Sequence, residues 1–280
     1  MTILDWCAFT RPIQYTEAQP FQNTFMRRVM LVTATFNELM PAVMNHATSA
    51  LSPTTPQRPY RQAWVCPNIG WRINADWKRK EALIVFNGSA CEMLRKIGPD
   101  AIRQVLLLAV ETGTRLDLAT DIETDLPVRD VEKAGWAKKI RSTSFISSQT
   151  GDTLYIGSRS SGAFARVYRY AEPHPRHALL RIEHEMKKEQ ARSVAQIAAV
   201  HGLETAQRSV AAKFSYQHPE IAQAFEGVSE RIVTERHERT LAKTEIWLMT
   251  QAAPAFQRLV AEGVIEDPAA WVKKHMLGHT

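Results

Sequence analysis

An arginine and a tyrosine two residues apart are the side chains of this sequence best suited to chemistry. The segment from Thr153 to Tyr170 has the pattern of two strands joined by a turn rich in glycine and serine. Because side chains alternate between the two faces of a strand, Arg166 and Tyr168 share one face. A guanidinium beside a phenol can hold a phosphate next to a nucleophile. A phenol with a pKa of about 10 is a weak nucleophile at neutral pH, so it needs a base, a metal ion or a cation such as Arg166.

Two further segments, 114–123 and 178–187, are expected to form strands with one polar face and one apolar face. Each polar face mixes acidic side chains with an arginine. The residues of these faces are Arg115, Asp117 and Asp121 in the first segment, and Arg181, Glu183 and Glu185 in the second. If these two strands lie beside the strand of Tyr168, the three polar faces form one concave surface.

The acidic side chains of this surface could bind a divalent metal ion. Carboxylates are hard ligands that suit magnesium or manganese, and such an ion acts as a Lewis acid on a phosphodiester. We therefore expect a metal site made by Asp117, Glu183 and Glu185. The sequence contains no His-hydrophobic-His triplet, so a site built on paired imidazoles is excluded. The alternative is that Asp117 and Glu183 form salt bridges between strands, with Arg115 or Arg181 as the partner.

The net charge of +6 comes from one part of the chain. Between Trp136 and Lys188 there are ten basic and four acidic residues, so the rest of the chain is neutral, which indicates a polyanionic partner here. The turn at 157–159 could cradle a phosphate, although a plain hairpin turn explains it equally well. The residues expected to contact the polyanion are Lys138, Lys139, Arg141, Ser158, Arg159 and Lys187. The alternative location is the C-terminal helical region, with Arg231, Arg236, Arg239 and Lys243.

Hydrophobic periodicity predicts an α+β protein with helices packed on a sheet. Strands are expected at 3–10, 70–77, 82–86, 114–123, 142–147, 153–156, 164–170 and 178–187. Helices are expected at 23–40, 90–97 with Ser89 as its N-cap, 99–111, 128–136, 190–200, 203–213, 219–232, 240–262 and 268–277. The proline-rich stretch 47–60 is expected to be an exposed loop. Because helices follow one another after Lys188, we expect a mixed domain over 1–200 and a helical region over 201–280.

Several classes of protein are disfavoured by the sequence. The three cysteines, Cys7, Cys66 and Cys91, are far apart and form no CxxC pair, so neither a disulfide framework nor a zinc site is indicated. The amino-terminal segment lacks the basic region of a secretory signal peptide, and the longest strongly apolar run is too short to cross a bilayer. We therefore expect a soluble protein of the cytoplasm.

Several short motifs, taken in order, resemble one protein family. They are Leu4-Asp5-Trp6, the turn at 87–91, the segment 114–121, the segment 154–159, Arg166-Val167-Tyr168, and Leu180-Arg181-Ile182-Glu183. Their order and approximate spacing are similar to those of the Rep-trans replication initiation factors, the rolling-circle initiators and relaxases of plasmids, phages and integrative elements. The resemblance covers roughly residues 3–200. It implies an antiparallel sheet flanked by helices, in a catalytic nicking domain over 1–200.

The resemblance also implies an activity, the nicking and joining of DNA. A tyrosine of the family attacks a phosphodiester, stays bonded to the 5′ phosphate and frees a 3′ hydroxyl for a polymerase. The Arg-hydrophobic-Tyr motif places that nucleophile at Tyr168, and the acidic positions of the family fall on Asp117 and Glu183. The implied partners are single-stranded or supercoiled origin DNA, magnesium or manganese, and a host helicase and polymerase, with a dimer as one oligomeric state.

The sequence departs from the family pattern directly after the tyrosine. Where the family has an acid and then a lysine, this chain has Arg169 and Tyr170. The role of the missing lysine is therefore open, and Tyr170 is a second candidate nucleophile. The alternative function is a sequence-specific DNA-binding protein on the same scaffold that lacks catalysis.

Overall fold

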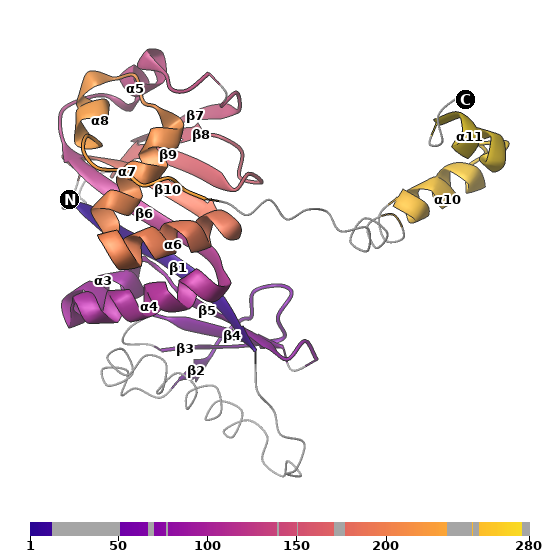
Figure 1. Ribbon diagram of the computed structural model, residues 1–280, viewed down its shortest axis with the longest axis horizontal. Helices are drawn as coiled ribbons and strands as arrows, with labels where there is room; N and C mark the ends of the chain where they lie inside the picture. The colour runs from indigo at the N-terminus through magenta and orange to yellow at the C-terminus, as the bar shows by residue number, and fades with distance from the viewer. Residues whose placement is uncertain are drawn as a thin grey trace, which may run out of the picture. The chain divides into compact units, whose positions relative to one another are not determined.

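The protein folds as two compact units, Met1–Thr234 and Glu235–Thr280. The boundary expected after residue 200 therefore falls inside the first unit. The structure, a computed structural model (Figure 1), describes residues 1–12, 51–66, 70–76, 78–138, 140–149, 151–170, 177–233, 248 and 252–275. The expected helix at 23–40, Lys139 and about half of the expected helix at 240–262 lie outside these ranges.

An antiparallel sheet of ten strands runs through the described part of the first unit, in the order β2-β3-β4-β5-β1-β6-β10-β9-β8-β7. The expected strands are all present. The short β2 lies inside the stretch expected to be a loop, and β3 was not expected. The bounds are β1 Thr2–Pro12, β2 Ser52–Pro53, β3 Gln62–Val65, β4 Arg72–Asp76, β5 Glu81–Phe86, β6 Gly113–Glu123, β7 Thr143–Ser148, β8 Gly151–Ile156, β9 Ala163–Arg169 and β10 Leu179–Lys187.

The helices follow the predicted positions closely, with two corrections. Asn87, not Ser89, is the N-cap of α3, because its Oδ1 accepts from the Ala90 amide at 3.0 Å. The helix expected over 219–232 ends much earlier, as α8. The bounds are α3 Gly88–Ile97, α4 Pro99–Thr112, α5 Val128–Ala134, α6 Glu189–His201, α7 Leu203–Phe214, α8 Pro219–Ala224, α10 Ala253–Ala261 and α11 Pro268–His275. Among the described residues, no helix is long and apolar enough to span a membrane.

One face of the sheet is covered by a layer of helices, α3, α4, α6 and α7 (Figure 1). Leu118, Val167 and Ile182 point into this interface and are fully buried, as the alternation of apolar and polar residues predicts. α7 contacts β1, β6 and β10, which is why the first unit extends beyond residue 200. The helix layer therefore does not cover the opposite, polar face of β6, β10 and β9, which holds the candidate site residues.

The helix-facing side of β10 also contains one buried polar network. His184 contacts Gln207 of α7 at 3.2 Å and the hydroxyl of Tyr216 at 2.9 Å, through its two ring nitrogens. Burial lowers the pKa of His184 to about 4, so the imidazole is neutral at physiological pH. The Gln207 amide also donates to Thr120 of β6 at 3.0 Å. This network ties α7 to the two strands that carry the acidic residues.

Candidate active site

The three strands with polar faces are neighbours in the sheet, in the order β6, β10, β9. The register then decides which polar side chains meet. Glu185 lies opposite Asp117 of β6, and Glu183 lies opposite Arg166 of β9. Arg181 lies opposite Tyr168 of β9. Partners that lie opposite one another in an antiparallel pair point to the same face, so these side chains form one surface.

Arg115 holds two of the carboxylates on this surface. Its Nε and Nη2 donate to the two oxygens of Asp117 at 2.9 and 2.5 Å, and its Nη2 lies 2.9 Å from Glu185. Lys187 lies 2.8 Å from the other oxygen of Glu185. The guanidinium also lies over the ring of Trp6 of β1, 4.7 Å from the ring centroid. Asp117 is completely buried beneath these side chains.

Tyr168, Arg166 and Glu183 form a second group beside the first. The Tyr168 hydroxyl donates to Oε2 of Glu183 at 3.4 Å, and Nη2 of Arg166 contacts Oε1 of the same carboxylate. Arg166 also lies 3.8 Å from Asp117, so one guanidinium faces two acids. Its Nε is buried and has no hydrogen-bond partner among the described residues. The predicted nucleophile, cation and acids are thus in direct contact.

Burial controls the protonation of this group. Burial raises the pKa of Asp117 to about 7, although the hydrogen bond and charge of Arg115 oppose the rise. Burial likewise raises the pKa of Glu183, against the lowering effect of Arg166. Burial, followed by the charge of Glu183, raises the pKa of the Tyr168 phenol well above its usual value. The phenol therefore stays protonated at neutral pH, and it can react only if a base takes its proton.

The observed contacts bear on whether Asp117 and Glu183 are metal ligands or salt-bridge partners. Asp117 pairs with Arg115, as the salt-bridge alternative predicts. Glu183 pairs with Arg166 and not with Arg181. Arg181 instead binds both oxygens of Asp121 at 2.6 and 2.7 Å, because Asp121 is its direct partner on β6.

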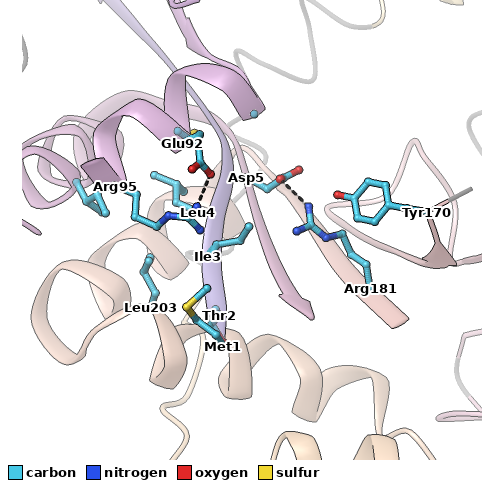
Figure 2. A pocket seen from close by; sticks show the side chains of 13 residues that line it. Met1, Thr2, Ile3, Leu4, Asp5, Glu92, Arg95, Tyr170, Arg181 and Leu203 are labelled. Atoms are coloured by element: carbon cyan, nitrogen blue, oxygen red, sulfur yellow. Dashed lines mark hydrogen bonds and ion pairs between the residues drawn. The ribbon is translucent and has the colours of Figure 1, made fainter. Parts of the chain in front are cut away.

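A pocket of about 550 Å³ adjoins the second group at the start of β1, where β1 pairs with β6 and not yet with β5. Figure 2 shows Asp5 of β1 pointing toward Arg181, with the ring of Tyr170 beside the guanidinium. The Asp5 carboxylate accepts from Arg181 at 3.2 Å, and the Arg181 guanidinium lies 5.1 Å from the centroid of Tyr170. Tyr170 in turn packs edge-to-face against Tyr168, with centroids 5.5 Å apart. Tyr170 therefore lines the pocket and also contacts Tyr168, the candidate nucleophile.

The residues expected to bind a polyanion lie mainly at one end of β8, β9 and β10. Ser158 and Arg159 form the turn between β8 and β9, and the Lys187 amine donates to the Arg159 carbonyl. The Arg159 guanidinium lies over the rings of Tyr155 and Phe164, at 5.5 and 5.6 Å from their centroids. Lys138 and Arg141 are exposed in the segment before β7.

Comparison with known proteins gives a fold and no family. No protein-family model and no curated protein matches the sequence. A solved structure, that of a rolling circle replication initiator protein from Geobacillus stearothermophilus, matches with a TM-score of 0.60 and 15% sequence identity, over 83% of this chain and 98% of that chain. The chain has the fold of this replication initiator.

The metal ion that the sequence resemblance implies does not fit the described arrangement. The donor chemistry is suitable, since Asp117, Glu183 and Glu185 offer hard oxygens on one surface. However, guanidinium groups already occupy all three carboxylates, and no group of three histidine, cysteine, aspartate or glutamate side chains in the described ranges could hold an ion. A metal would have to displace Arg115 or Arg166 first.

The sequence did not single out Trp6 or Asp5 as site residues. Both lie on β1, which pairs with β6 along the edge of the polar surface. Asp5 lies at a register shift of β1 and is hydrogen-bonded to Arg181. The sequence did show an acid and a tryptophan within an otherwise apolar strand. This pattern marks the two residues as unusual, but it does not show which side chains they contact.

Proposed function

We propose that the protein is a DNA nicking-closing enzyme that initiates rolling-circle replication, with Tyr168 as its nucleophile. The observation that carries the proposal is the contact of the Tyr168 hydroxyl and the Arg166 guanidinium with the same carboxylate, Glu183. The shared fold with a rolling circle replication initiator supports the general function. A nucleophile, its base and a cation for the phosphate are the groups that phosphodiester transesterification requires.

The proposed step is an attack of the Tyr168 oxygen on the phosphorus of one DNA strand. The phenolic proton passes to Glu183, whose raised pKa makes it a stronger base than an ordinary glutamate. The new bond joins the tyrosine oxygen to the phosphorus, and the bond from phosphorus to the 3′ oxygen breaks. The 3′ oxygen takes a proton from water and leaves as a hydroxyl, and the resulting hydroxide takes the proton from Glu183, which restores the carboxylate. The reverse reaction rejoins the strand.

Arg166 is proposed to stabilise the charge that develops on the phosphate. The Arg166 side chain is 26% exposed, so the accessible part of its guanidinium can donate to a phosphate oxygen. The contacts with Glu183 and Asp117 hold the guanidinium in place before the substrate arrives. A preorganised donor of this kind lowers the barrier because it needs no reorientation during the reaction.

The proposed substrate is an unpaired strand of origin DNA. Tyr170 borders the pocket beside the nucleophile, and aromatic rings bind unpaired bases by stacking. A pocket of about 550 Å³ lies in the range of small-molecule sites, so it can accept a base and sugar. Negative supercoiling would expose such a strand in duplex DNA. The freed 3′ hydroxyl would then serve a host polymerase, with a helicase that separates the strands.

A covalent adduct distinguishes the enzyme from a non-catalytic DNA-binding protein on the same scaffold. An enzyme acting by this step becomes joined to the 5′ phosphate of the cleaved strand, and the adduct survives denaturation. A binding protein retains the DNA only until it is denatured. Adduct formation with labelled origin DNA therefore tests the proposed function.

A further inference from the structure

We infer that a pocket between the β8–β9 turn and the helices α6 and α7 binds a backbone phosphate of the DNA strand, at a distance from Tyr168. The inference rests on the proposed function, because that function makes DNA the ligand. The pocket has a volume of about 360 Å³. Its polar lining comes from four separate parts of the chain: Arg141 and Ser142, Ser158 and Ser161, Gln190, and Lys213.

The chemistry of the lining is that of an anion site. Arg141 and Lys213 each bring a positive charge, and none of the described residues that line the pocket is acidic. Ser142 and Ser158 add hydroxyl groups, and the Gln190 side chain adds an amide. Gln190 is also the second residue of α6, where the free backbone amides and the helix dipole favour a negative charge. Two cations, hydroxyls and a helix start together match a phosphate.

The shape of the turn is fixed by its glycines and serines. Gly157 has φ +92°, a left-handed conformation that favours glycine. A Cβ on Gly162 would lie 2.6 Å from Nε2 of Gln190, so this position has to stay without a side chain for Gln190 to keep its place. The Ser161 hydroxyl donates to the Ser158 carbonyl at 2.6 Å, which braces the turn. The pocket is therefore built before a ligand binds.

The pocket lies within reach of a strand held at the nicking site. Ala163 lines the pocket and begins β9, and Tyr168 is five residues further along the same strand, about 17 Å away at the rise of a β-strand. That span corresponds to no more than about five nucleotides at the rise of B-form DNA. Lys187, whose amine contacts the Arg159 carbonyl, lies at the same end of the sheet as the pocket. A strand that occupies both sites would pass from the polar face of the sheet around the β8–β9 turn to the face that α6 and α7 cover.

Salt-dependent binding of random single-stranded oligonucleotides tests this inference without any need for nicking. Each phosphate contact contributes about 0.7 to the slope of log K against log salt for single strands. Lys213→Gln and Arg141→Gln should each lower the slope by about 0.7, with an unchanged melting temperature as the check on folding. The matched control is Lys133→Gln, an exposed lysine of α5 that pairs with Asp130.

The outcomes separate the pocket from the proposed activity. A lower slope in both pocket variants and an unchanged slope in Lys133→Gln support the phosphate site, even if no adduct forms with origin DNA. Equal slopes in the wild type and in folded Lys213→Gln and Arg141→Gln overturn the phosphate site, even if the adduct forms normally. If Lys133→Gln lowers the slope by the same amount, the phosphate site is also overturned, because removal of any exposed lysine would then lower the slope.

Discussion

The guanidinium of Arg166 contacts the carboxylate of Glu183, its direct partner across the β9–β10 pair. The same guanidinium lies 3.8 Å from Asp117, which is completely buried. One arginine therefore offsets charge on two buried acids and also faces the hydroxyl of Tyr168. Stability and catalysis are coupled at this position, and variants can separate the two roles.

Arg166→Gln should reduce both stability and nicking. It leaves two buried carboxylates with less compensation, which costs about 1–3 kcal/mol for a pair that keeps some exposure to solvent. It also removes a donor to the phosphate, which costs about 100-fold or more in rate. Arg166→Lys should restore most of the stability and little of the rate, because an ammonium lacks the planar fork of a guanidinium. Urea unfolding and single-turnover nicking measure the two effects, and equal recovery of both would contradict the separate roles.

Asp117→Asn should become more stable relative to the wild type as the pH rises from 4 to 7. In the folded protein the pKa of Asp117 is about 7, whereas its ordinary value is 3.8. The folded state therefore binds more protons than the unfolded state over this window, and the wild type loses stability as the pH rises. The difference between the two proteins should grow by at most about 4 kcal/mol, since one pKa unit corresponds to about 1.4 kcal/mol. Denaturant unfolding at several pH values measures it, and a constant difference would show that the pKa is not raised.

Metal binding, which the resemblance implies, should improve when Arg115 is removed. Arg115→Gln frees oxygens of Asp117 and Glu185, so its affinity for Mn²⁺ at pH 8 should exceed that of the wild type about tenfold. Calorimetric titration of the DNA-free protein measures it, and Arg103→Gln, an exposed position on α4, is the control. Absence of Mn²⁺ binding in every variant, together with undiminished nicking in chelator, would exclude a metal role.

The sequence predicted which side chains of the site share a strand face, because side chains alternate between the two faces of a β-strand. Alternation alone placed Arg166 and Tyr168 on one face of β9, and Glu183 and Glu185 on one face of β10. It could not decide which strands pair, since pairing depends on contacts between residues far apart in the chain. The partner of Glu183 was therefore open, and the register of β9 with β10 assigned it to Arg166.

The remaining differences have local causes. Asn87 and Ser89 are both good N-cap residues, and only the geometry of the turn selects Asn87. The apolar pattern after Pro219 extends to Ile232, yet Gly227 adopts φ +115° and a helix cannot continue through it. Position 227 carries no sequence signal stronger than a single glycine, which helices often tolerate.

The most direct measurement is the identity of the residue joined to DNA after cleavage. A single strand that carries the origin and a 3′ label is incubated with the wild type, Tyr168→Phe and Tyr170→Phe, and the products are denatured and separated. The account predicts a labelled adduct for the wild type and for Tyr170→Phe, and none for Tyr168→Phe, which should still bind DNA because it loses only the phenolic oxygen. An adduct that persists in Tyr168→Phe, or that disappears only in Tyr170→Phe, would contradict the account.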